Sequence, residues 1–278
     1  MICPAAISAG PHAHRALRDG ASGTVASLFE RSLYVKLGDQ LICIGPHGLG
    51  DGPLNLLCDP FTHRLAIGDR VNFAISRLRL GSLIIDCANV SEWRPPVVAS
   101  ASREGLALLS PYIAKFPAEG LSRLLANDET TPVLRAARPA AEALTDFVGN
   151  ATTEAPHELI SIIGLGPGLT PSGDDFLGGA MIALATLNET KKRDAIWRLI
   201  APHLTERTTD ISAAHLSAAA EGYGHAALHA FIAALNAGEN AKLTPAIDTL
   251  TAIGHTSGLD ALAGAVTVFR ASAPTIRG

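Results

Sequence analysis

The hydrophobic pattern of the chain changes at the pair Pro95-Pro96, and this change constrains the fold more than any other feature. Before it, short runs such as SLYVKLGDQLICIG and RVNFAISRLRL are separated by Gly, Pro and Asp residues, which is typical of strands and hairpins. After it, a long region rich in Ala and Leu has helical periodicity. The sequence therefore predicts an α+β protein, with a small β-barrel or sandwich-like domain over residues 1–95 and a mainly α-helical domain over residues 96–278.

The second domain should contain several helices. We expect them over residues 102–110, 118–126, 131–148, 173–187, 191–201, 210–236 and 258–270. The segment 210–236 should break between Gly222 and Gly224, because glycine is unfavourable inside a helix. Pro139 should end or kink the helix in which it lies, unless it belongs to a first turn.

Composition excludes two kinds of partner. The formal net charge is -4 and no stretch is rich in Lys and Arg, so nucleic acid is not an expected partner. No apolar run is long enough to cross a membrane, and the N-terminus does not resemble a secretory signal. We therefore expect a cytoplasmic protein without a membrane partner. Because only 17% of the residues are charged, some faces should be covered by other subunits in a homo- or hetero-oligomer.

Neither the cysteines nor the histidines predict a metal site. The four cysteines lack CxxC spacing, which favours reduced thiols over disulfides or zinc binding. They are Cys3, Cys43, Cys58 and Cys87. His225 and His229 have a spacing that could bind a metal on a helix, but no Glu or Cys accompanies them.

The segment GLGPGLTPSGDD, residues 164–175, is the strongest candidate for a functional site. It follows the apolar run LISII and leads into an apolar helix. Thr170 or Ser172 can cap this helix, and Ser172 with Asp175 has the spacing of a capping box. Glycines allow positive φ angles, and unpaired amides at a helix N-terminus favour an anion. The predicted ligand is a small anion, and the predicted binding residues are Gly164, Gly166, Gly168, Thr170, Ser172, Gly173 and Asp174.

The same segment departs from the known phosphate-binding loops. Gly168 and Gly173 have the glycine spacing of a P-loop, but Asp174 and Asp175 follow where Lys and Ser or Thr are required. Two carboxylates reverse the local charge, so a bound phosphate would need Mg²⁺ or an arginine beside it. No other cofactor is expected. The alternative interpretation is a glycine-rich turn before a well-capped helix, with no ligand.

A second copy of part of this motif lies near the C-terminus. SGDDFLGGA, residues 172–180, and SGLDALAGA, residues 257–265, share the pattern SGxDxLxGA. They are either an internal repeat or two similar solutions to helix capping, and the Gly-Ala pairs would allow close helix approach. If the copies face one another, Asp175 and Asp260 flank a shared cleft, and His255, Thr256 and Ser257 supply neutral hydrogen-bonding groups.

Two further segments supply candidate residues. In TERTTDIS, the guanidinium of Arg207 suits two-point binding of a carboxylate or phosphate, and Thr208 is adjacent to it. Ordinary helix capping by Thr209 or Asp210 is the alternative. His255 could give or take a proton near neutral pH. The predicted catalytic residues are Asp175, Asp260 and His255, and the other predicted binding residues are Arg207, Thr208, Thr256 and Ser257.

Taken together, GLGPGLTPSGDDFLGG, GHTSGLDALAG and RTTDIS resemble a bacterial family of largely uncharacterised proteins that includes the AllH subunit of oxamate carbamoyltransferase. The resemblance implies a role with partner subunits in the allantoin pathway. There, a carbamoyl group would be transferred between carbamoyl phosphate and oxamate, giving oxalurate and phosphate. Two functions are therefore expected as alternatives: a subunit that binds substrate and acts in catalysis, or a non-catalytic subunit that binds a small anion or supports assembly.

Overall fold

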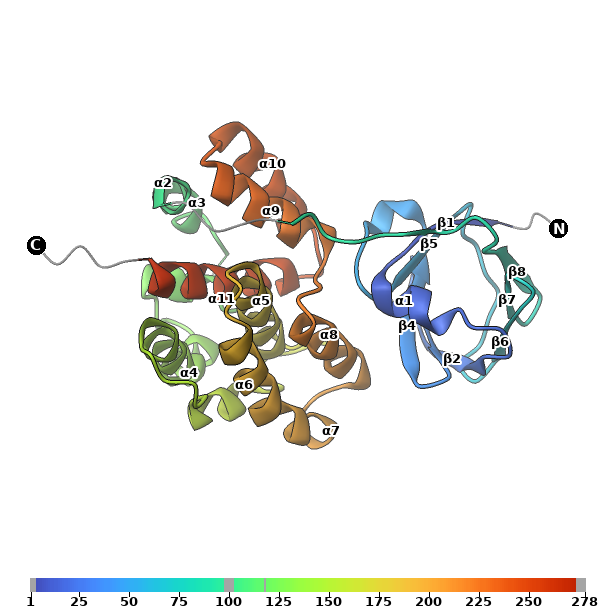
Figure 1. Cartoon of the computed structure of the whole chain (residues 1–278), viewed down its shortest axis with the longest axis horizontal. Coiled ribbons are helices and arrows are strands. Elements are labelled where there is room, and N and C mark those ends of the chain that lie inside the picture. The colour runs from blue at the N-terminus through green and yellow to red at the C-terminus, as the bar shows by residue number, and fades with distance from the viewer. Residues whose placement is uncertain (1–3, 98–102, 118, 274–278) are drawn as a thin grey trace, which may run out of the picture. The chain divides into compact units, whose positions relative to one another are not determined.

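Two compact units make up the chain, Met1–Pro95 and Pro96–Gly278. The computed structural model describes residues 4–97, 103–117 and 119–273. Each unit has its own hydrophobic core. Figure 1 shows strands around a barrel in the first unit and packed helices in the second. The predicted α+β class is confirmed.

The N-terminal unit is a closed β-barrel. Its strands are β1 (Ala5–Ala9), β2 (Ser22–Leu28), β3 (Leu33–Leu37), β4 (Gln40–Gly45), β5 (Asn55–Asp59), β6 (Arg70–Ala74), β7 (Arg77–Leu80), β8 (Leu83–Asp86) and β9 (Ser91–Glu92), with a helix α1 (Pro11–Ala16) and a 3-10 turn η1 (His47–Leu49). The strand order is β5-β4-β3-β2-β6-β7-β8-β1-β9, and β1 also pairs with β5, with Ala6 opposite Cys58. Because this pairing joins β1 to β5, strands β1 to β8 form a barrel and not a sandwich.

Alternating side chains fill the barrel. In β3, Val35 and Leu37 are buried whereas Lys36 is exposed, because successive side chains of a strand point to opposite faces. The segment LGDQL forms the turn that the sequence predicts, with Leu37 paired to Gln40 and Gly38 at a φ of 62°. The short apolar runs therefore encode both the strands and the barrel interior.

The C-terminal unit is helical. Its helices are α2 (Arg103–Ala107), α3 (Ser110–Ile113), α4 (Pro132–Gly149), α5 (Ser172–Thr186), α6 (Thr190–Ile200), α7 (Leu204–Arg207), α8 (Asp210–Ala220), α9 (Ala226–Ala237), α10 (Asn240–Thr251) and α11 (Ser257–Ser272), and its 3-10 turns are η2 (Ser122–Ala126), η3 (His157–Ile162) and η4 (Ala201–His203). Helices α5 and α11 pack against each other near the centre of this unit (Figure 1). Within the described ranges, no helix is both long and apolar enough to cross a membrane.

The longer helices agree with the sequence-based expectations, and the short ones differ. Helices α4, α5, α6 and α11 lie where they were expected, and the segment 210–236 breaks between α8 and α9. The expected helix 102–110 forms only as the shorter α2, α3 begins at its last residue, and only the 3-10 turn η2 forms within 118–126. Residues 102 and 118 lie outside the described residues. Short helices gain little from their own hydrogen bonds, so packing decides their form.

Two helices of this unit contain an internal proline. Pro139 lies inside α4, which continues to its expected end, and Pro245 lies inside α10, where no helix was predicted. Proline removes one helical hydrogen bond, but α10 still buries a stripe of apolar side chains with helical spacing. These side chains are Leu243, Ala246, Ile247 and Leu250. Tertiary packing therefore outweighs the local cost of the proline.

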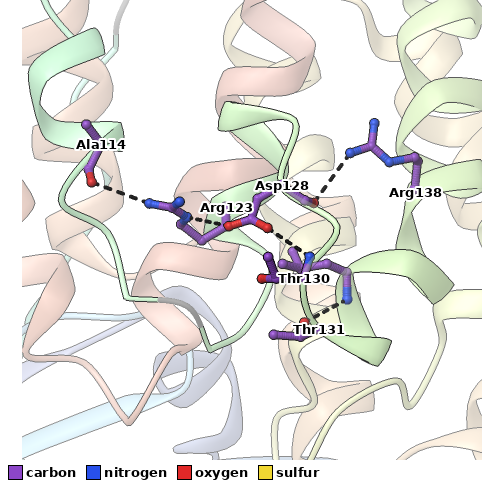
Figure 2. Close-up of polar contacts among 7 residues, drawn as sticks. Ala114, Arg123, Asp128, Thr130, Thr131 and Arg138 are labelled. Carbon is purple, nitrogen blue, oxygen red and sulfur yellow. Dashed lines mark hydrogen bonds and ion pairs between the residues drawn. The ribbon is translucent and has the colours of Figure 1, made fainter.

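Hydrogen bonds fix the segment between η2 and α4 (Figure 2). Arg123 donates from Nε to Asp128 Oδ2 at 3.0 Å, and the amide of Thr130 donates to Asp128 Oδ1 at 2.8 Å. These bonds, first those from Thr130, hold the pKa of Asp128 below its ordinary value. Thr131 caps α4 by accepting from the amide of Leu134 at 3.2 Å. The start of η2, which contacts the candidate site, is thereby held in place.

Candidate functional site

Helices α5 and α11 meet at two glycines. A Cβ on Gly179 would lie 1.8 Å from the carbonyl oxygen of Ala261, and a Cβ on Gly264 would lie 1.9 Å from the carbonyl oxygen of Phe176. No side chain fits at such distances, so both positions require glycine. The predicted close approach of the two Gly-Ala segments is confirmed.

These contacts are related by the repeat SGxDxLxGA. Gly179 in the first copy corresponds to Gly264 in the second, and Phe176 corresponds to Ala261. Each glycine therefore packs against the same point of the other copy. Such a reciprocal arrangement is expected of two equivalent structural units and not of two unrelated helix caps.

A second pair of equivalent glycines also approaches backbone carbonyl oxygens closely. A Cβ on Gly173 would lie 1.9 Å from the carbonyl oxygen of Ile162, and a Cβ on Gly258 would lie 2.1 Å from that of Leu250. In both copies the second residue of the motif thus touches the backbone of the preceding helical segment. The structure supports the interpretation of the motif as an internal repeat.

Hydroxyl groups join the starts of α5 and α11. Thr170 Oγ1 and Ser257 Oγ are 2.9 Å apart, and Ser172 Oγ and Thr256 Oγ1 are 3.5 Å apart. These four predicted binding residues come from segments more than 80 residues apart in the sequence. The two motif copies therefore lie side by side at one place in the helical unit.

The prediction of capping boxes is wrong. Neither α5 nor α11 has a side-chain hydrogen bond at its N-cap. Instead, the hydroxyl of Ser257 lies beside the carboxyl of Asp175, and the hydroxyl of Ser172 lies beside the carboxyl of Asp260. Because the two helix starts face one another, each carboxyl has its hydroxyl neighbour across the pair and not in its own helix.

The two carboxyls of the repeat are desolvated. Asp260 is fully buried and Asp175 is partly exposed, and the Oδ2 atom of each is buried with no hydrogen-bond partner among the described residues. Burial raises the pKa of Asp175 well above its ordinary value, and the negative charge of Asp260 raises it further. Burial also raises the pKa of Asp260. The pair therefore favours a bound proton or a bound cation.

The start of η2 holds Asp260 in place. The amide of Leu121 donates to Asp260 Oδ1 at 2.5 Å, which partly offsets the effect of burial on the pKa of Asp260. Gly120 has a φ of 73°, and a Cβ there would lie 2.4 Å from Asp260 Oδ1. Sequence analysis missed Gly120 and Leu121, because no local pattern indicates a partner 139 residues away.

Asp174 anchors the glycine loop. Its Oδ1 atom accepts from the amide of Gly164 at 2.8 Å, and its Oδ2 atom accepts from Ser212 Oγ at 2.7 Å and from Thr208 Oγ1. Both carboxylate oxygens therefore accept hydrogen bonds from groups of the protein. This carboxylate and Thr208, two of the predicted binding residues, tie the loop to the start of α8.

The glycine loop, residues 164–171, has the conformation that the sequence predicts. Gly164, Gly166 and Gly168 have φ angles of 74°, 111° and 98°. The amides of Gly166, Gly168, Leu169 and Thr170 make no hydrogen bond within the described residues. Loop amides of this kind can bind an anion.

Arg207 lies beside the loop through its backbone. A Cβ on Gly164 would lie 2.0 Å from the carbonyl oxygen of Arg207. Its guanidinium is exposed and donates from Nη1 to the carbonyl oxygen of Ile160 at 3.4 Å. Thr209 caps α8 by accepting from the amide of Ser212 at 3.0 Å, while the binding role of Arg207 stays a prediction.

The candidate histidines have different environments. His255 is exposed, with Nε2 3.7 Å from Glu119 Oε2. His225 Nδ1 accepts from the amide of Ala227 at 3.1 Å, and His229 Nε2 accepts from that of Gly224 at 3.0 Å. Burial lowers the pKa of His229 to about 4. His225 and His229 therefore shape the turn before α9.

No metal centre rich in Cys or His is present in the part of the chain that the structure describes. Among those residues, no three His, Cys, Asp or Glu side chains are placed to hold a metal ion together. Cys43, Cys58 and Cys87 are buried, whereas Cys3 lies outside the described residues. Burial raises the pKa of Cys43 to about 11 and that of Cys58 to about 12, so both thiols stay protonated at neutral pH.

These features define a class of protein: a β-barrel unit followed by a helical unit in which two repeated helix starts form one polar cluster. Residues 5–92 match the model of the AllH family N-terminal domain, and residues 162–269 match the model described as oxamate carbamoyltransferase subunit AllH. The two matches together cover more than two thirds of the chain, and the chain belongs to the AllH family. No solved structure matches it.

Proposed function

We propose that this chain is a subunit of an enzyme that transfers a carbamoyl group between carbamoyl phosphate and oxamate. In that reaction the amide nitrogen of oxamate attacks the carbonyl carbon of carbamoyl phosphate. The bond from this carbon to the phosphate oxygen breaks, and the nitrogen proton leaves to the phosphate. The products are oxalurate and inorganic phosphate. The observation that carries the proposal is the match of both units to the AllH family.

The glycine loop supports a role in binding the anionic reactants. Amides of Gly166, Gly168 and Thr170 are open to a ligand, next to the N-terminus of α5. Donors that are already oriented stabilise phosphate and carboxylate groups without reorganisation. Arg207 contacts the same loop through its backbone carbonyl oxygen, and we expect its exposed guanidinium to bind a carboxylate or phosphate there in two-point fashion. We expect catalysis by this site to consist mainly of positioning.

The polar cluster supports separate roles for the three proposed catalytic residues. Asp175 is partly exposed as a residue although its Oδ2 atom is buried, and of the two carboxyls we assign the contact with a ligand to Asp175. Asp260 is fully buried and bound to the amide of Leu121, so it acts as a positioning residue. His255 is exposed beside Glu119 and would contact substrate only if that segment approaches the loop.

A non-catalytic role is the alternative, and one observation favours it. Both carboxylate oxygens of Asp174 accept hydrogen bonds from the protein, and Asp260 has no exposed surface. A cluster with so few accessible reactive groups suits a subunit that binds a small anion or supports assembly. In this alternative, partner subunits supply the groups that act on the carbamoyl carbon.

Reconstitution with the partner subunits tests both roles. The assay is phosphate-dependent cleavage of oxalurate by the complex, and the test variant is Asp175→Ala. If the site is catalytic, we expect kcat to fall about 100-fold or more while the complex still assembles. The exposed Asp248 provides a matched control as Asp248→Ala. Full turnover by the Asp175→Ala complex would exclude Asp175 from catalysis and favour the assembly role.

A further inference from the structure

We propose that Asp175 and Asp260 form a site for a divalent cation such as Mg²⁺, completed by hydroxyl oxygens from the starts of α5 and α11. The proposal goes beyond the transfer reaction and stands on the geometry of the polar cluster. A second part, that this cation helps to hold a phosphate at the glycine loop, rests on the proposed function.

The first argument is the state of the carboxyl oxygens. Asp260 is 0% exposed, and its Oδ2 atom has no hydrogen-bond partner within the described residues. The Oδ2 atom of Asp175 is also buried and has no hydrogen-bond partner within the described residues. No ion pair to either carboxyl is found in the described part of the chain. Buried carboxylates are normally paired with a cation or coordinate a metal ion. The hydrogen-bonding neighbours of these two carboxyls are neutral amides and hydroxyls, and the unpartnered Oδ2 atom of each indicates a missing positive charge.

The second argument is the chemistry of the surrounding groups. The side chains that lie against the two carboxyls carry hydroxyl oxygens and come from Thr170, Ser172, Thr256 and Ser257. Carboxylate and hydroxyl oxygens are ligands of hard cations, whereas a transition metal would be expected to have Cys or His. Two carboxylates with an adjacent phosphate site are typical of Mg²⁺, which keeps several water ligands and shares its coordination with substrate phosphates.

The third argument is access and rigidity. Asp175, Thr256 and Ser257 are partly exposed, so an ion can reach the cluster from their side. Asp260 is fixed by the amide of Leu121, and the two helices cannot move apart or closer without disturbing the contact at Gly179. The two carboxyls are therefore held at a constant separation, as a coordination site requires.

The competing occupant is a proton shared between the carboxyls. A cation and a proton compete for the same oxygens, so they are distinguished by direct measurement of metal binding. Mn²⁺ is a suitable probe because it also takes oxygen ligands, and electron paramagnetic resonance reports its free concentration. The experiment uses the full chain at pH 8, where protons compete least, with Mg²⁺ as a competitor.

We expect saturable binding of one Mn²⁺ per chain with a Kd below about 1 mM, displaced by Mg²⁺. Asp260→Asn and Asp175→Asn should each weaken binding about tenfold or more, while Asp248→Asn should leave it unchanged. Circular dichroism verifies that each variant is folded. If Asp260→Asn does not fold, Ser257→Ala keeps both carboxyls and should still weaken binding.

The absence of saturable binding to the natural chain, or unchanged binding by folded Asp175→Asn, would overturn the site and leave the proton as occupant. Inorganic phosphate tests the second part, since it should raise the affinity for Mn²⁺ if the cation helps to hold the anion. If phosphate does not change the affinity for Mn²⁺, the proposal that the cation helps to hold a phosphate is overturned. Oxalurate cleavage is a separate readout, so failure of the proposed reaction is distinguishable from failure of the cation site.

Discussion

Gly179 and Gly264 are reciprocal contact points of the central helix pair. Each lies in its own copy of SGxDxLxGA, and each packs against the carbonyl oxygen of the equivalent residue in the other copy, Ala261 or Phe176. A helix pair held at this separation brings the two helix starts together. The polar cluster at the candidate site is therefore a consequence of how these glycines pack.

Substitution of these glycines should destabilise the helical unit. We expect Gly179→Ala or Gly264→Ala to lower the free energy of unfolding by about 1–3 kcal/mol or more, because the new methyl group would force the backbones apart. Gly178→Ala is the matched control, since its Cβ would lie 3.7 Å from the nearest atom and alanine favours a helix. Urea denaturation measures all three variants, and equal midpoints for Gly178→Ala and Gly179→Ala would contradict the contact.

The carboxyl pair should make stability depend on pH. Burial raises the pKa of Asp175 and Asp260 above the ordinary value of 3.8, so the folded chain holds protons that the unfolded chain releases. Their contribution to stability is present below about pH 4 and is lost as the pH rises towards the folded-state pKa values. The loss is at most about 1.4 kcal/mol per pH unit for each proton.

Urea denaturation between pH 4 and pH 8, in the presence of a chelator, measures this effect. Asp175→Asn and Asp260→Asn should each flatten the decline relative to Asp248→Asn, because an amide does not titrate. Mg²⁺ should reduce the decline in the natural chain if it replaces the lost protons. A decline equally steep in all three variants would show that the carboxyl pair does not cause it.

Asp174 should control the order of the glycine loop. Asp174→Asn replaces the carboxylate with a neutral side-chain amide. The backbone N–H of Gly164 and the hydroxyls of Ser212 and Thr208 then lose their charged acceptor. We expect a loss of about 1–3 kcal/mol in the free energy of unfolding and faster hydrogen exchange across residues 164–171. The exposed Asp210, as Asp210→Asn, should cost less than about 1 kcal/mol. Unchanged exchange in Asp174→Asn would rule out the anchoring role.

Two loop glycines should differ in their tolerance of alanine. Gly168 has a φ of 98° and open space around it, so Gly168→Ala meets only backbone strain of about 1–3 kcal/mol. Gly164 has a φ of 74°, and its Cβ would also lie 2.0 Å from the carbonyl oxygen of Arg207. Gly164→Ala should therefore be the less stable variant by thermal denaturation. The reverse order would mean that the loop and Arg207 are not packed as described.

The local features of this protein could be predicted from its sequence. The change of hydrophobic period near Pro95 marks the end of the barrel strands, and the long apolar helices follow from their spacing. The three positive φ angles at Gly164, Gly166 and Gly168 follow from the residue type. Helix α10 was not expected from the sequence, and it forms around Pro245 because burial of its apolar stripe outweighs one lost hydrogen bond.

The partners of the polar side chains were decided only by the tertiary structure. Ser172 and Asp175 have the spacing of a capping box, yet their neighbours are Asp260 and Ser257 of the other copy. The sequence determined that each helix start carries a hydroxyl and a carboxyl. Packing at Gly179 brought the two starts together and desolvated them, and desolvation by distant parts of the chain leaves no local pattern for sequence analysis to detect.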